Sequence, residues 1–201
     1  MFVGVPDHMW STAITVKPVN EPVTLPEAKA WLRVTDDDEN TTIRSLIKMV
    51  REAGEKTTGR AFISQTIALY LDEFPAGGLP IRPPSPPFQS LTSIAYLDTD
   101  GNSQTWSSSL YETDFTQEPG RVQPIATETY PSTDDAAKAV TVTYVAGYGD
   151  DPVHVPFSIR RDILRGVAHL YDEGRSNVIT GTIASELPMG RLFLLDRMLE
   201  V

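Results

Sequence analysis

Hydrophobic residues recur with helical spacing in two long stretches of the chain. In the first stretch they stand at positions i, i+3, i+4, i+7 and i+10, namely Ile43, Leu46, Ile47, Val50 and Ala53. This spacing predicts an amphipathic helix over residues 40–58, ended by Gly59. The second stretch opens at Pro156, and its apolar stripe consists of Ile159, Ile163, Val167, Leu170 and Tyr171. It predicts a second long helix that stops at Gly174.

A shorter helix is predicted near the N-terminus by a capping signal. Thr24 can accept a hydrogen bond from the first turn, Pro26 is tolerated there, and Glu27 stands three residues after Thr24 as its capping-box partner. The helix is expected to stop near Val34. The preceding residues 1–21 show no sustained period, and we expect them to form an extended arm.

Between these helices the hydrophobic period changes from 3.6 to two. Ile67, Leu69 and Leu71 alternate with more polar neighbours and predict a strand. Further strands are expected at 91–97, 104–106, 121–125 and 140–144, and the first two are joined by the turn signal Asp-Thr-Asp-Gly at 98–101. Five prolines within 80–87 exclude regular structure there.

These patterns predict an α+β fold, mainly α, in which a small helical bundle is interrupted by an antiparallel β insertion. The bundle comprises residues 22–62 and 147–175, and the insertion comprises residues 63–146. An extended N-terminal arm (1–21) precedes the bundle, and a C-terminal tail with a short helix (176–201) follows it.

Charge narrows the classes of function. The 201 residues include 27 acidic and 17 basic side chains, which gives a formal net charge of −10. Such a balance argues against general nucleic-acid binding, which depends on Lys and Arg, and against docking on anionic membranes. No run of apolar residues is long enough to predict a membrane span. Residues 98–135 hold eight acidic side chains and one basic one, so the β region carries much of the negative charge.

No motif predicts a catalytic, cofactor or metal site. The chain has no cysteine, and its three histidines (His8, His154 and His169) lack the spacing of zinc ligands. Neither the acidic run at 36–40 nor the turn at 98–101 completes a calcium loop. No serine stands in a G-x-S-x-G context, and the Gly-Tyr-Gly turn after the last strand lacks the Lys-Ser/Thr ending of a phosphate loop. None of these motifs therefore indicates an active site.

Two interpretations are open for a basic stripe on the first long helix, formed by Arg44, Lys48 and Arg51. Glu52 and Glu55 follow Lys48 and Arg51 by four residues, so the stripe can be a solvated face with internal ion pairs. It can also be a contact with the acidic surface of another subunit in a ring.

The order of the segments resembles that of tailed-phage head–tail connector (adaptor or head-completion) proteins. The resemblance covers residues 20–200, without the arm, and no single motif carries it alone. It rests on the colinear segments PVTLPEAK at 22–29, WLRV at 31–34, TGRAFISQT at 58–66, IR with the following prolines at 81–87, 87–96, PGRV at 119–122, VTYVAGYG at 142–149 and the helix at 156–171.

The resemblance implies a structural virion protein that is not an enzyme and binds no cofactor. Such proteins form a homo-oligomeric ring of about twelve copies beneath the portal protein, where they extend the DNA channel. The ring provides the docking platform for the stopper or tail-completion protein, and double-stranded DNA passes through the lumen without specific binding. The expected location is the head–tail junction of the virion, after synthesis in the cytoplasm of a host bacterium. Two alternatives are a small acidic enzyme that uses carboxylates of the β region and a transient phage assembly factor.

The C-terminal tail is the expected portal contact. Its apolar residues would be costly to leave exposed and could fold on docking: Leu187, Leu192, Phe193, Leu194, Leu195 and Met198. The alternative is that these side chains pack on the helices of their own subunit, and the sequence favours neither.

Overall fold

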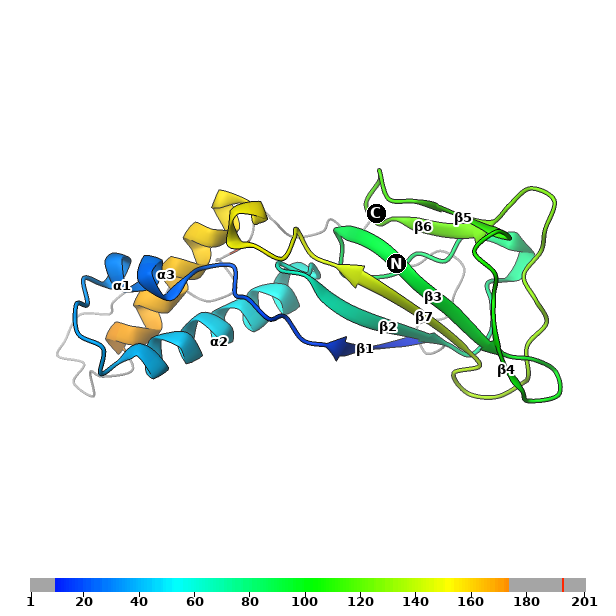
Figure 1. The fold of residues 1–201 in the computed structure, drawn as a ribbon, viewed down its shortest axis with the longest axis horizontal. Helices are drawn as coiled ribbons and strands as arrows, with labels where there is room; N and C mark the ends of the chain where they lie inside the picture. Colours follow the sequence, from blue (N-terminus) through cyan, green and yellow to red (C-terminus); the bar gives the residue numbers. More distant parts are fainter. Residues whose placement is uncertain (1–9, 174–192, 194–201) are drawn as a thin grey trace, which may run out of the picture. The chain divides into compact units, whose positions relative to one another are not determined.

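The computed structural model describes residues 10–173 and Phe193. The chain divides into two compact units (Figure 1). A sheet unit comprises the described residues 10–17 and 64–147, and a helical unit comprises residues 18–63, 148–173 and Phe193. The helical unit is therefore built from two separate pieces of chain.

Three α-helices form the helical unit: α1 (Leu25–Leu32), α2 (Asn40–Thr58) and α3 (Phe157–Glu173). The predicted capping box at the start of α1 is confirmed. The Glu27 backbone N–H donates to the Thr24 hydroxyl at 3.3 Å, and the Thr24 N–H donates to the Glu27 carboxylate at 2.9 Å. Gly59 ends α2 with a φ of 70°, and its N–H donates to the Glu55 carbonyl at 2.9 Å. A short 3-10 turn, η2 (Pro152–His154), precedes α3.

The two predicted apolar stripes form the core of the helical unit. They meet the segment before α1 and the segment after α2, and the buried side chains of this core include Val23, Ile43, Ile47, Val50, Phe62, Ile159, Ile163 and Val167. Burying apolar side chains of this size stabilises the helical unit by about 1.5–3 kcal/mol each.

The sheet unit holds an antiparallel five-stranded sheet and a separate two-stranded sheet. The strand order of the larger sheet is β1-β2-β7-β3-β4, and the smaller sheet pairs β5 with β6. The strand bounds are β1 Trp10–Val16, β2 Gln65–Leu71, β3 Phe88–Leu97, β4 Ser103–Thr105, β5 Tyr111–Asp114, β6 Arg121–Pro124 and β7 Val140–Ala146. A short 3-10 turn, η1 (Ala76–Gly78), follows β2.

Alternating side chains of the central strands fill the core of the sheet unit. Val140, Val142 and Tyr144 are fully buried on β7, and Ile94 of β3 lies opposite Val142. The Tyr144 hydroxyl donates to the Pro84 carbonyl at 2.8 Å, which ties the proline-rich segment to the sheet. The predicted turn between β3 and β4 is confirmed, since the Gly101 N–H donates to the Asp98 carbonyl at 2.9 Å with Gly101 at a φ of 79°.

The expected mainly α fold is wrong. Among the described residues, seven strands stand beside three α-helices, and the strands build a compact unit of their own. Part of the predicted N-terminal arm is a strand, because Trp10–Val16 forms β1. This strand pairs with β2 from Trp10↔Leu71 to Val16↔Thr66. Six of the seven residues of β1 are exposed, so no alternation of buried and exposed positions marks it in the sequence.

Candidate assembly surfaces

The three residues of the predicted basic stripe on α2 differ in solvent exposure. Arg44 and Lys48 are exposed, whereas the side chain of Arg51 is only 4% exposed. The Arg51 Nε donates to Glu21 and its Nη1 donates to Glu55, each at 2.6 Å. Glu55 also accepts the Phe62 N–H at 2.9 Å. Arg51 therefore ties three segments of its own subunit together, while Arg44 and Lys48 form the exposed part of the stripe.

Electrostatics agree with an internal role for Arg51. Burial alone would lower the pKa of the Arg51 guanidinium, but the carboxylates of Glu55 and Glu21 outweigh burial and raise that pKa. Burial also raises the pKa of Glu55, and Arg51 only partly offsets this effect. The pair holds the helical unit together and does not present a free charge to a neighbour.

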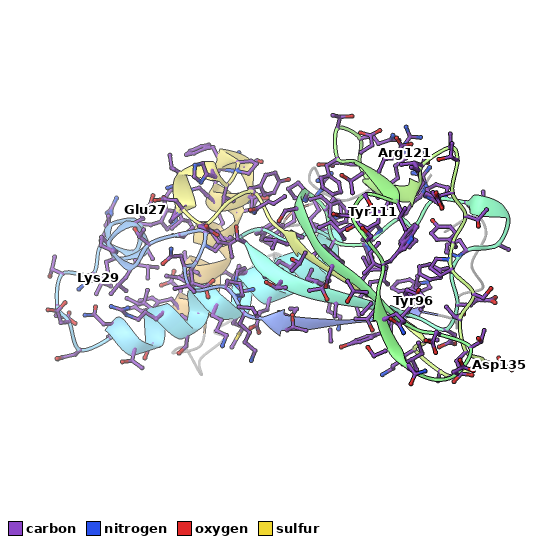
Figure 2. The ribbon with its side chains drawn as sticks, turned by 45° about the vertical axis from the view of Figure 1, so that its right-hand side comes forward. Glu27, Lys29, Tyr96, Tyr111, Arg121 and Asp135 are labelled. Carbon is purple, nitrogen blue, oxygen red and sulfur yellow. The ribbon has the colours of Figure 1, made fainter. Side chains whose placement is uncertain are left out.

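A second ion pair joins α1 to α3. The Arg160 guanidinium donates to the Glu27 carboxylate, and Figure 2 shows Glu27 on α1. Burial raises the pKa of Glu27, but hydrogen bonds from Thr24 and the charge of Arg160 outweigh it, so the pKa lies below its ordinary value. Lys29 reaches the acidic run instead and donates to Asp37 at 2.7 Å. Asp37 thus serves the local structure before α2.

Acids of the sheet unit fix turns. Asp98 accepts the backbone N–H of Asn102 at 2.9 Å and the side-chain amide of Gln104 at 2.8 Å, and these hydrogen bonds lower its pKa. Asp114 accepts from the Thr116 hydroxyl at 2.6 Å and from Gln117 at 2.8 Å, which lowers its pKa well below the ordinary range. These carboxylates are engaged in the hairpins that contain them.

Four further acids line a shallow cavity of about 350 Å³ in the sheet unit, namely Asp72, Glu73, Asp134 and Asp135. The rest of the lining is Thr133, Ala136 and Ala137, so it offers no histidine, lysine or arginine to a reaction. Asp72 accepts the Lys138 N–H at 2.8 Å, and Asp134 accepts the Asp135 N–H at 2.8 Å. Among residues 10–173 and Phe193, no group of three or more histidines or acids is arranged to hold a metal ion.

The two edges of the five-stranded sheet differ in length and charge. One edge is β4, three residues long, which follows a turn containing Asp98 and Asp100. The other edge is β1, seven residues long and without a charged side chain. Ile14 lies opposite the buried Ile67 of β2 yet is 50% exposed, and Val16 is 56% exposed. Long, uncharged and apolar edges are the ones that accept another strand, whereas short or charged edges resist pairing.

Of the tail residues proposed for the portal contact, the structure describes Phe193. Its side chain is 1% exposed and belongs to the core of the helical unit, 5.4 Å from the Phe62 ring between ring centroids. The other five candidates, Leu187, Leu192, Leu194, Leu195 and Met198, lie outside the described residues. In this structure Phe193 contacts its own subunit.

Comparisons with known proteins give a fold likeness along almost the whole chain. No protein family profile matches the sequence, and no curated protein matches it. A chain in the virion of a native gene transfer agent (GTA) particle is similar, with a TM-score of 0.75 and 16% identity over 94% of this chain and 96% of that one. A chain in the neck of an empty GTA particle, computed with C6 symmetry, has a TM-score of 0.74 and 16% identity over 95% and 97%.

A chain in the neck of a native GTA particle, computed with C12 symmetry, has a TM-score of 0.63 and 16% identity over 94% of this chain and 97% of that one. The chain therefore has the fold of chains that occur in these particle structures, over both units. No helix within residues 10–173 is long and apolar enough to cross a membrane.

The sequence alone did not point to two of these features. The edge strand β1 has no alternating pattern, and its one signal is the uncharged stretch WSTAITV. The place of Phe193 depends on two residues that are distant in sequence: Gly54 of α2, which leaves room for its ring, and Asp162 of α3, which accepts its N–H at 3.1 Å. A glycine in the middle of an otherwise regular amphipathic helix was the available signal, because such a glycine is unfavourable unless close packing requires it.

Proposed function

We propose that this protein is a structural component of the neck of a tailed-phage-like particle. In particular, we propose that it is the head–tail adaptor, a ring of about twelve copies that lies beneath the portal, extends the DNA channel and receives the stopper or tail. The observation that carries the proposal is the likeness to chains of GTA virion and neck structures, which extends over 94–95% of this chain.

Ring formation is supported by symmetry and by the sheet edges. Two of the similar neck structures were computed with C6 and C12 symmetry. A closed ring needs a heterologous contact, in which one surface of each copy meets a different surface of the next. The exposed edge of β1, with Ile14 and Val16, is the surface where we expect a second copy of this chain. Arg44 and Lys48 on α2 are separate candidates for a contact between copies.

The charge of the chain suits a channel that DNA crosses without binding. A net charge of −10 per copy repels phosphates, whereas specific and non-specific DNA binding both depend on cationic contacts. The proposed location is the head–tail junction of a virion assembled in a bacterial host, and the proposed role requires no cofactor or catalysis.

The decisive experiment adds the purified chain to DNA-filled heads that lack it and images the junction by electron microscopy. The proposal expects a closed ring of new density below the portal, and counting its subunits gives the symmetry. Saturating protein without added density would contradict the adaptor role. Mass spectrometry of purified virions then separates a neck component, which remains in the particle, from a transient assembly factor, which does not.

The portal contact is tested separately, in the tail. We propose that apolar tail residues beyond the anchored Phe193 reach the portal, and deletion of residues 187–201 is expected to abolish portal binding. Leu195→Asp and Met198→Asp, which keep Phe193, should do the same. Unchanged binding of purified portal by these variants would refute the contact.

A further inference from the structure

Gly54 leaves room for two aromatic rings against α2. A Cβ atom built at this position would lie 2.7 Å from Cε2 of Phe62 and 2.8 Å from Cζ of Phe193, distances that real Cβ atoms do not show. Glycine is less favourable than alanine inside a helix, so its presence here is explained by the close approach of these rings. Together, Gly54 and Phe62 form a slot on the helical unit, and the ring of Phe193 fills it.

The backbone of Phe193 is recognised as well as its side chain. Its N–H donates to Oδ2 of Asp162 on α3 at 3.1 Å. Asp162 is buried, and its other oxygen, Oδ1, accepts from Arg161 Nη2 at 3.1 Å, with Arg165 Nη1 at 3.8 Å. The arginines therefore orient one oxygen and leave the other for the tail. A buried amide bound to a carboxylate is a strong hydrogen bond and fixes the direction of the bound chain.

We propose that Gly54, Phe62 and Asp162 form a peptide-binding site that holds the C-terminal tail of the same chain by Phe193. The slot selects an aromatic side chain, and Asp162 selects the backbone N–H of the same residue. The three site residues come from α2, from the segment after it and from α3. This site anchors the tail on the helical unit at residue 193, independently of whether the chain occupies a particle neck.

The first test uses full-length protein and chymotrypsin, with mass spectrometry to identify cleavage after residue 193. In the native chain the buried Phe193 is expected to be protected. Asp162→Ala should increase the rate of that cleavage at least tenfold, and Asp38→Ala, which removes an exposed acid before α2, should leave it unchanged. Equal rates in the native chain and in Asp162→Ala would overturn the proposal.

A second test removes the Phe193 side chain from the slot and supplies it again on a separate peptide. Full-length Phe193→Ala is titrated with a fluorescein-labelled peptide of residues 187–201, followed by fluorescence anisotropy. Saturable binding is expected, and a peptide with alanine at position 193 should bind at least tenfold more weakly. Equal binding of the two peptides, or no binding of either, would overturn the proposal.

Protein concentration distinguishes the two sources of Phe193. Protection that is independent of concentration supports the chain's own tail. Protection that increases with concentration would mean that a second copy supplies Phe193, which contradicts the proposal. None of these measurements needs phage heads, so their failure is separate from a failure of the adaptor function.

Discussion

Different kinds of side-chain interaction join distant segments in the two units. In the helical unit, ion pairs join α1, α2, α3 and the segment before α1, through Arg51 with Glu21 and Glu55 and through Arg160 with Glu27. In the sheet unit, Asp98 and Asp114 serve local turns, and packed aromatic rings join segments that are distant in sequence. Those rings are Phe74, Tyr96, Trp106, Tyr111 and Tyr130, of which Tyr96 and Tyr111 are labelled in Figure 2.

Acid should weaken both units through carboxylates whose pKa is lowered in the folded chain. In the helical unit this carboxylate is Glu27, and in the sheet unit these are Asp98 and Asp114. Aromatic contacts depend on burial and not on protonation near neutral pH. Burial raises the pKa of Tyr130 to about 12, which keeps its hydroxyl neutral throughout the physiological range. Four substitutions test how each unit is held together.

The largest effect is expected from Trp106→Ala in the sheet unit. Trp106 packs against Phe74, Tyr111 and Tyr130 at centroid distances of 5.6, 5.0 and 5.3 Å, so its removal leaves a cavity. The free energy of unfolding should fall by about 3–5 kcal/mol, measured by urea denaturation with hydrogen exchange to locate the loss in β3 and β7. Trp31→Ala, on the exposed side of α1, is the matched control and should cost far less. Equal losses would show that the ring cluster does not hold the sheet unit.

Arg51→Ala is expected to cost about 2–3 kcal/mol in the helical unit, because it leaves the buried Glu55 without its cation. This loss is smaller than the roughly 3–5 kcal/mol typical of fully buried pairs because Glu21 is partly exposed. Arg44→Ala, on the exposed face of the same helix, should change the stability by less than about 0.5 kcal/mol. Adding Glu55→Gln to Arg51→Ala should recover part of the loss in the same denaturation assay. Without that recovery, the cost comes from lost packing and not from the unpaired charge.

Glu27→Gln tests the acid sensitivity with a smaller effect. Glutamine can keep the capping box but removes the charge beside Arg160. Because the folded-state pKa of Glu27 lies below the ordinary 4.5, its stabilisation is present above that pH and is lost as pH falls through the folded-state value. The side chain is 37% exposed, so we expect a loss of about 0.5–1 kcal/mol at pH 7 after solvent screening. Denaturation at pH 7 and below pH 4 should show the difference from the native chain shrinking with acid, and a constant difference would contradict this.

Ile14→Lys should have the smallest effect on stability, within about 0.5 kcal/mol, because the side chain lies on an exposed edge. Its effect should appear in assembly instead, since a charge on an edge strand opposes pairing with another strand. Added density on heads lacking the protein is the measurement. Val19→Lys, at an exposed position of the helical unit, is the control. Normal ring formation by Ile14→Lys would exclude β1 as the contact between copies.

Sequence reasoning succeeded where the decisive interactions are local. The stripe from Ile43 to Val50, the capping box of Thr24 and Glu27, and the turn at Asp98 all depend on residues within a few positions of one another. It overestimated the share of helix relative to strand, and it missed contacts between residues that are distant in sequence. β1 and β5 contain no buried residue and therefore show no alternating pattern, so neither strand was predicted and the fold was expected to be mainly α.

The candidate site shows the same limit. Glu55 was visible as a partner of Arg51 four residues away, but Glu21 and the burial of the pair depend on a segment 30 residues earlier. Phe193 was placed on a portal-facing surface because hydrophobicity alone does not say which partner covers a side chain. Its slot requires Gly54 and Asp162, which only the tertiary structure brings together.

The position of β1 has a consequence for the dynamics of the sheet. β1 is hydrogen-bonded to β2 along one side and is joined to it through the residues of α1 and α2. An exposed edge strand with such a long connection opens at low free energy, so its amides should exchange with solvent earlier than those of the central β7. A neighbouring strand added to that edge would make β1 an interior strand. Assembly would then be measurable as slower amide hydrogen exchange in residues 10–16.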